Sequence, residues 1–433
     1  MQQPTTATSD PYKIDKLVPA LIRGPEWMRE RRRLSRETFN TTPLPRRGLH
    51  LWRYTDPAKF LIKQENITDT AFTEGYDAIE QIELSHLEQG HLSGLVTDFG
   101  GREIRIYCAD DLSKKGVVVS SLSETSEQYH NLVEQHLYQL VNSQTGKFEA
   151  MNGALFNDGI FVYIPDNVTV DKPLHLLRET GGANSAWFPR LLVVVGKNAE
   201  FTIIDEYGGG SVDIDGGVSH SNGAVEIFGG QDSRIRYVSL QRQAAATHSY
   251  LTHRARIERG ANMLTIPLAF GGAVSKQNFG VILNGEGAVS NMYGLLFGSG
   301  NQHFDNHTLH HHATGRTQSN IDFKVVLRDR AVSAYTGLIR IDKNAKTCEA
   351  YQGNRNLLLN KGTKAEAIPE LEILNEDIKC THGATIGPID PLSVFYLTSR
   401  GIQHEDAVRM IVSGFVASTL KRITEDLKER ITE

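Results

Sequence analysis

Between residues 153 and 373, short apolar runs alternate with tight turns, and this alternation constrains the fold more than any other feature of the chain. The runs predict strands at residues 160–164, 191–195, 201–204, 224–228, 235–240, 280–283 and 323–327. Many connections are too short for a crossover helix. Several turns share a form in which a charged or glycine residue precedes alanine, as in Gly285-Glu286-Gly287-Ala288, but their spacing is irregular. The pattern alone leaves a sandwich, a barrel and a β-helix open.

Helical patterns flank this region on both sides. Residues 1–152 are predicted to form a mainly helical N-terminal region, with one helix over Glu26 to Phe39 and a strand at residues 104–107. Ser123 and Ser126 are candidate N-caps for a helix with apolar or aromatic positions at Leu132, Val133, His136, Leu137 and Leu140. The predicted domains are therefore residues 1–152, 153–373 and 374–433.

The C-terminal region is also predicted to be helical. Asp390 and Pro391 suit the N-cap and N1 positions of one helix, and Gly401 suits its C′ stop. A second helix is expected to begin near His404. It carries an apolar stripe of Ala407, Val408, Ile411, Val412, Phe415, Val416 and Leu420. So much apolar surface must dock on the core or on a partner.

Cys380 and His382 are the strongest candidate ligands in the chain. If this segment is extended, the two side chains lie on one face, because strand side chains alternate. A thiolate and an imidazole suit zinc, copper or iron–sulfur chemistry, but two ligands do not complete a metal site. The pair is therefore either structural or half of a site completed from elsewhere, such as another chain.

A second cluster holds five histidines within residues 303–312. On a strand, His303, Asp305 and His307 share one face, whereas His310 and His312 share the other. The first set is a secondary candidate for metal binding. The alternative is a ladder of hydrogen-bonded histidines on a β surface.

Composition excludes several classes of function. The net charge of −5 argues against nucleic-acid or anionic-membrane binding. Three widely spaced cysteines form no disulfide framework, and no apolar segment has the length of a membrane helix, so a cytoplasmic protein is expected. The phosphate-loop, dinucleotide-binding and nucleophile-elbow motifs are all missing from the sequence.

Several segments together resemble the SufB/SufD family of iron–sulfur cluster assembly proteins. The similarity runs from about Leu49 to Leu420 and is carried by residues 52–57, 303–308, 330–332, 335–337, 379–387, 395–402 and 411–415. The Cys-Thr-His-Gly-Ala-Thr stretch at residues 380–385 resembles the SufD branch, since the SufB branch has Glu-His-Glu-Ala-Thr there. The position of a SufB cysteine is matched here by Asn354, so Cys348 does not take over that role.

The resemblance implies a mainly β fold, with a right-handed parallel β-helix core between helical regions. It also implies a complex with a SufB-like paralogue and a SufC-like ATPase, in which the SufD core pairs edge to edge with SufB. A transient iron–sulfur cluster would be shared with SufB through Cys380 and His382. The ATPase would dock on the C-terminal helices, at Ser399, Arg400, Gly401, Ile411 and Phe415.

We therefore expect a non-catalytic scaffold subunit. Reduced flavin accompanies some complexes of the family and is retained as a candidate cofactor, although the sequence holds no motif for it. Two alternatives are a metalloenzyme built on the histidine cluster and a carbohydrate-active β-helix protein. The latter would need clustered acidic residues on one sheet face, and no such concentration is present in the sequence.

Overall fold

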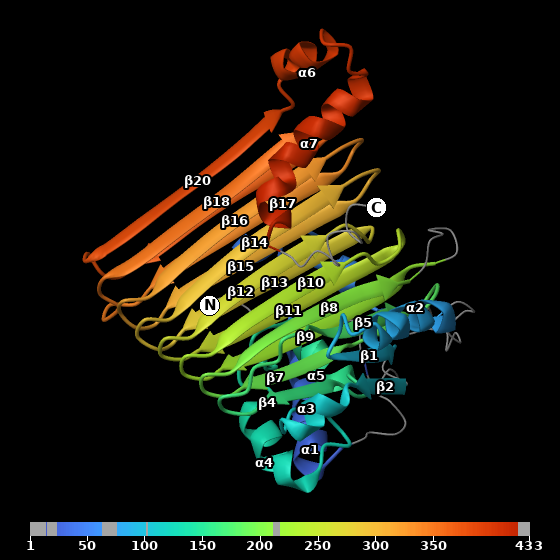
Figure 1. The fold of residues 1–433 in the computed structure, drawn as a ribbon, viewed down its shortest axis with the longest axis vertical. Coiled ribbons are helices and arrows are strands. Elements are labelled where there is room, and N and C mark those ends of the chain that lie inside the picture. The colour runs from blue at the N-terminus through green and yellow to red at the C-terminus, as the bar shows by residue number, and fades with distance from the viewer. Residues whose placement is uncertain (1–13, 15–23, 63–75, 101–102, 211–216, 423–433) are drawn as a thin grey trace, which may run out of the picture.

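A computed structural model describes residues 14, 24–62, 76–100, 103–210 and 217–422. Its center is a coil of parallel strands arranged in two ten-stranded sheets (Figure 1). From β7 onward, consecutive long strands alternate between the sheets, so the chain winds around a shared apolar interior. The predicted parallel β-helix is confirmed, and the sandwich and barrel alternatives are wrong.

The bounds of the strands follow the winding. The first sheet contains, in spatial order, β2 (Glu103–Cys108), β1 (Gly94–Phe99), β5 (Leu174–Thr180), β8 (Glu200–Gly209), β10 (Arg234–Gln241), β12 (Asn262–Ala269), β14 (Val289–Gly298), β16 (Gln318–Leu327), β18 (Cys348–Leu358) and β20 (Ile378–Pro388). The second contains β19 (Lys364–Ile373), β17 (Val332–Ile341), β15 (His303–His312), β13 (Val274–Leu283), β11 (Thr247–Ile257), β9 (Ser219–Gly229), β7 (Arg190–Val195), β4 (Ile160–Ile164) and β3 (Val118–Ser121), with β6 (Ala186–Trp187) beside β9.

Helices lie at both ends of the chain. They are α1 (Glu26–Thr41), η1 (His50–Trp52), η2 (Pro57–Phe60), α2 (Tyr76–Glu88), α3 (Asp110–Lys114), α4 (Glu127–His136), α5 (Lys147–Leu155), α6 (Pro391–Thr398) and α7 (His404–Leu420). The N-terminal region also supplies β1, β2 and β3, and β1 pairs in parallel with β5 of the coil. Strands of the two sheets lie before residue 152 and after residue 373, so the sheets cross both predicted domain boundaries. The division into three domains stays a prediction.

One corner of the coil explains the similar turns in the sequence. Left-handed residues occupy it in successive coils, namely Asn167, Asn198, Asp232, Gly260, Gly287, Arg316 and Thr347. Most donate their N–H to the next coil, as Asn198 does to the carbonyl of Gln231 at 2.8 Å. From Asn198 onward, each is followed by a small buried residue, in the order Ala199, Ser233, Ala261, Ala288, Thr317 and Cys348. Cys348 is therefore a corner residue packed inside the coil.

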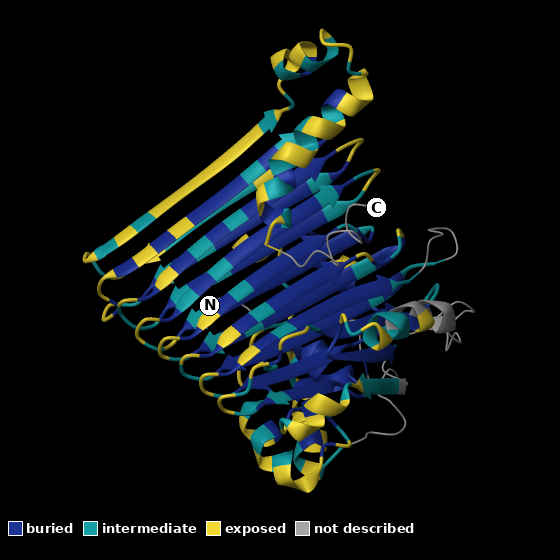
Figure 2. Cartoon of the chain, in the orientation of Figure 1, coloured by how far each residue is buried: buried dark blue, intermediate teal, exposed yellow. Residues whose placement is uncertain are grey.

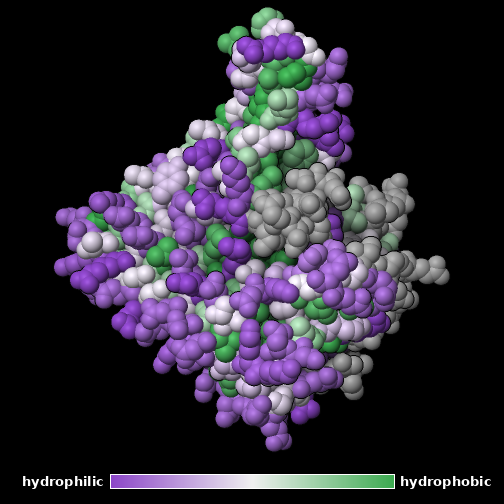
Figure 3. All heavy atoms as spheres, in the orientation of Figure 1, coloured by the Kyte–Doolittle hydropathy of each residue, from purple (hydrophilic) through white to green (hydrophobic). Residues whose placement is uncertain are grey.

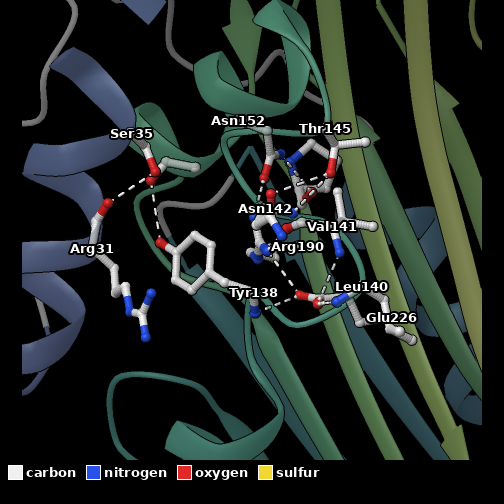
Figure 4. A network of polar contacts seen from close by, with 12 residues as sticks. Arg31, Ser35, Tyr138, Leu140, Val141, Asn142, Thr145, Asn152, Arg190 and Glu226 are labelled. Carbon is white, nitrogen blue, oxygen red and sulfur yellow. Dashed lines mark hydrogen bonds and ion pairs between the residues drawn. The ribbon is translucent and has the colours of Figure 1, made fainter. Parts of the chain in front are cut away.

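A buried polar network joins the N-terminal helices to the coil (Figure 4). The Glu226 carboxylate accepts the N–H groups of Tyr138, Leu140 and Val141 at 2.8–3.1 Å and pairs with Arg190 at 2.7 Å. Because these N–H groups bond to Glu226, α4 ends at His136. The predicted continuation of this helix to Leu140 is wrong.

Candidate functional site

Cys380 and His382 lie on β20, the last strand of the first sheet. β20 pairs in parallel with β18, so that Ala350 is opposite Cys380 and Gln352 is opposite His382. Ala350 and Gln352 are buried and face the interior of the coil, and the register places Cys380 and His382 on the same face. The predicted extended geometry is confirmed. The thiol and the imidazole lie at the end of the coil interior.

In the described part of the chain, this end of the coil is exposed. Among the described residues, β20 pairs only with β18, so its other edge carries unpaired backbone groups. Figure 2 shows β20 as an exposed strand beside the mostly buried strands of the same sheet. Large apolar side chains are also exposed nearby, including Ile373, Leu374 and Ile386. An exposed, partly apolar edge strand is a surface onto which another chain can add a strand.

Cys380 and His382 are two side chains of metal-binding types, whereas a metal site normally needs about four ligands. Cys380 is half-buried and packs against a small apolar cluster, and this burial raises the pKa of its thiol. A neutral thiol is a poor metal ligand, so binding would require loss of the proton. His382 is exposed. Within the described part of the chain, no group of three or more His, Cys, Asp or Glu side chains is arranged to hold a metal ion.

The outward face of β15 holds the secondary candidates and is covered by the N-terminal segment. Thr55 donates to Asp305 at 2.6 Å and contacts His303 at 2.8 Å. Lys276 of β13 contacts Asp305 at 2.9 Å and His307 at 2.7 Å. Burial alone would raise the pKa of Asp305, but Lys276 and His307 lower it below its usual range. The carboxylate is thus held as an anion by an ammonium group.

This cluster contains two residues that the sequence analysis missed. Lys276 and Thr55 lie 29 and 250 positions from Asp305 in the chain, so no local spacing pointed to them. Lys276 also donates to the carbonyl of Leu51 at 2.7 Å, which ties the N-terminal segment to the sheet. Metal binding by His303, Asp305 and His307 stays a prediction, and their present partners favour a structural link.

His310 and His312 point into the coil, so their predicted place on a β surface is wrong. Both are fully buried, and burial lowers the pKa of His310 to about 3 and that of His312 to about 4. His310 contacts Ser290 at 3.0 Å, and His312 lies between two hydroxyls, those of Thr317 and Ser319. The expectation that these histidines are hydrogen-bonded is confirmed. Side chains of both sheets point into one shared interior, which places His310 and His312 inside the coil and not on its surface.

The predicted docking residues of the C-terminal region differ in their surroundings: some are exposed, and Phe415 packs on the β-helix. The side chain of Asp390 caps α6, and Gly401 adopts a φ of +89°, as the capping pattern predicted. α7 packs on the outer face of the first sheet, where Phe415 joins an apolar cluster with Val326 and its carbonyl accepts from Lys324. Phe415 therefore contacts its own core, whereas Ser399, Arg400 and Gly401 are exposed.

α6 presents an apolar surface that the sequence analysis did not identify. Leu392, Phe395 and Tyr396 are 75%, 68% and 54% exposed, and Met410 on α7 is 53% exposed. Hydrophobic atoms gather at this end of the molecule in the space-filling view (Figure 3). Such a contiguous patch is typical of a site for another protein. Across the described ranges, no helix has the length and apolar character to cross a bilayer.

The fold defines the class of the protein: a parallel β-helix with an exposed last strand that carries a thiol and an imidazole on one face. Comparison with known proteins gives the family. Residues 177–415 match the model "SUF system FeS cluster assembly, SufBD core domain", and residues 22–176 match the SufBD protein N-terminal region. The chain belongs to the SufBD family of iron–sulfur cluster assembly proteins.

Curated relatives carry the same family name. The chain is 25% identical over 404 residues to an iron–sulfur cluster assembly SufBD family protein of Staphylococcus saprophyticus, covering 92% of this chain and 86% of the relative. Family members from Staphylococcus epidermidis and Staphylococcus haemolyticus are each 24% identical over the same coverage.

Proposed function

We propose that this chain is the SufD-like subunit of a cytoplasmic SufB–SufC–SufD scaffold, and that it acts without catalysis of its own. The observation that carries the proposal is the two-ligand site of Cys380 and His382 on the unpaired strand β20. A SufB-like paralogue would add its own edge strand there and supply the remaining ligands of a nascent cluster. The Cys-Thr-His-Gly-Ala-Thr sequence at residues 380–385 supports the SufD branch.

The cluster is the cargo of this site and is shared between the two chains. Cys380 would ligate it or act as a redox-sensitive thiol, and His382 would ligate or position iron. The raised pKa of the Cys380 thiol fits a site that gains its metal only when the partner arrives, because the isolated thiol keeps its proton. Flavin remains a candidate cofactor of the complex.

The SufC-like ATPase would dock on the C-terminal helices. The exposed loop at Ser399, Arg400 and Gly401 lies directly after α6, whose Phe395 and Tyr396 offer apolar contact area. Burial of such a side chain contributes about 1.5–3 kcal/mol to binding. Ile411 and Phe415 on α7 would act indirectly, since Phe415 fixes α7 to the β-helix.

Co-purification with SufB-like and SufC-like proteins from the same cell tests the proposed complex. For the shared site, His382→Ala should lower iron and acid-labile sulfide in the purified complex while leaving the complex assembled. Thr381→Ala is the matched control, since Thr381 is exposed on the same strand but faces the other side. Cluster content equal to that of the wild type in the histidine variant would refute the role of His382.

The docking surface has a separate test. Phe395→Ala should weaken ATPase binding at least tenfold in calorimetric titration while leaving the melting temperature unchanged, because Phe395 is 68% exposed. Phe415→Ala should instead lower the thermal stability of the C-terminal helices, because Phe415 packs on the core. Undiminished ATPase affinity in the Phe395 variant would show that α6 is not the docking surface.

A further inference from the structure

Residues 46–53 form an exposed segment that combines apolar side chains with positive charge. Leu49 and Leu51 are 56% and 53% exposed. The segment contains no acidic residue, and its three arginines are also exposed, namely Arg46, Arg47 and Arg53. Within the described ranges, none of these arginines forms an ion pair. Exposed leucines surrounded by unpaired arginines are typical of a protein-binding surface.

The segment is anchored to the β-helix at several points. Trp52 is buried, and its ring stacks parallel to that of Tyr250 of β11 at 5.9 Å. Lys276 of β13 donates to the carbonyl of Leu51 at 2.7 Å. The N–H of Leu49 donates to the carbonyl of Arg46 at 2.8 Å, which closes a turn before the anchored part. A surface that is already ordered loses little conformational entropy when a partner binds to it.

The segment reaches the exposed end of the coil. His50, which lies between the two leucines in the chain, is 3.2 Å from Glu370 of β19. β19 is the last strand of the second sheet, and over the described residues it pairs in that sheet only with β17. β19 and β20 are neighbours at this end, and Ile373 and Leu374 are exposed there. The leucines and arginines of residues 46–53 thus lie beside the end of the coil that carries Cys380 and His382.

Two kinds of partner fit an apolar surface with positive charge, namely an acidic protein surface and an anionic membrane. The unpaired edges of β19 and β20 favour a protein, because only another polypeptide can pair with the backbone groups of a strand. The net charge of −5 on the whole chain disfavours an anionic membrane. The partner is therefore expected to carry carboxylates around an apolar site, next to the strand that it adds to the coil.

We propose that residues 46–53 are a second contact for the SufB-like paralogue, in which Leu49 and Leu51 enter an apolar site on the partner and the arginines meet its carboxylates. The inference rests on the proposed function, since the same partner adds its strand at β20. Backbone pairing at a strand edge carries little sequence information, so side chains beside the edge must select the partner. Residues 46–53 would supply that selection.

The test measures binding of the full-length protein to the purified SufB-like paralogue from the same cell by calorimetric titration. The double variant Leu49→Ala/Leu51→Ala should bind at least tenfold more weakly and keep the melting temperature of the wild type, because both side chains are more than half exposed. Leu34→Ala is the matched control. Leu34 is 40% exposed on α1, which lies at the opposite end of the coil from β20 (Figure 1), so this variant should bind like the wild type.

A second variant tests the charges separately. Arg46→Glu/Arg47→Glu removes no apolar contact area, and both side chains are exposed, so the fold should be unaffected. It should weaken binding to the paralogue at least tenfold at low ionic strength. The difference from the wild type should shrink at high ionic strength, because salt screens exposed charges. If the leucine variant melts at a lower temperature than the wild type, the arginine variant decides the proposal.

The outcomes separate this inference from the proposed function. Wild-type affinity in either double variant, or equal weakening by Leu34→Ala, would overturn the inference and leave the shared site at β20 in place. If the wild-type protein does not bind the paralogue, both the inference and the proposed function are wrong. Binding to phosphatidylserine vesicles that Leu49→Ala/Leu51→Ala abolishes, with unchanged affinity for the paralogue, would assign the surface to a membrane and overturn the choice of partner.

Discussion

The buried carboxylate of Glu226 should hold the N-terminal helices on the β-helix. Glu226 and Arg190 are both fully buried, and the carboxylate accepts three backbone N–H groups from residues 138–141 in addition to the arginine. Glu226→Ala would leave these N–H groups without their acceptor and Arg190 without its counter-charge. Removing one partner of a buried ion pair costs about 3–5 kcal/mol.

The loss of stability in Glu226→Ala should appear first at the residues that bond to the carboxylate, before the whole fold is affected. The amide groups of Tyr138, Leu140 and Val141 bond directly to the carboxylate, so they report its removal. A decrease of about 3 kcal/mol in the free energy of local opening corresponds to roughly 100-fold faster hydrogen exchange. Exchange measured by mass spectrometry on peptides covering residues 137–142 should show this increase, while peptides from β14 and β16 keep their wild-type rates.

Two variants complete the experiment. Glu226→Gln keeps one oxygen acceptor but loses the charge, so its effect should be intermediate. Glu200→Ala removes an exposed carboxylate whose pair with Arg234 is 3.7 Å long, and it should change stability by less than about 1 kcal/mol. Wild-type exchange at residues 137–142 in Glu226→Ala would refute the anchoring role and show that helix packing alone holds this region.

Two further predictions concern the coil itself. Burial holds the pKa of His253 and His310 at about 3 and that of His312 at about 4, against 6.5 for an ordinary histidine. The unfolded chain therefore takes up protons between pH 6.5 and 4 that the folded chain does not. The free energy of unfolding should be insensitive to these groups above pH 6.5 and should fall below it, by up to about 1.4 kcal/mol per pH unit for each histidine. Denaturant titrations across this range check the slope, and an unchanged slope in the double variant H310N/H312N would contradict the assignment. At the coil corner, Thr347 has a φ of +58°, so Thr347→Gly should raise stability by about 1 kcal/mol in thermal unfolding, and a loss would show that its side chain matters more than the strain.

The sequence determined the local elements and the chemistry of the last strand. Alternation alone placed Cys380 and His382 on one face, because strand geometry depends only on neighbouring residues. The caps at Asp390 and Gly401 were equally local. The apolar runs at 160–164 and 191–195 became β4 and β7 within a residue of their predicted bounds.

Tertiary structure decided how these elements face one another. A sandwich, a barrel and a β-helix use the same short strands, and only pairing between distant coils distinguishes them. The same pairing turned His310 and His312 inward and brought Lys276 and Thr55 onto Asp305. It also set Phe415 against the sheet and left Phe395 in solvent. The sequence shows which face of a strand or helix is apolar, but what covers that face depends on contacts between residues far apart in the chain.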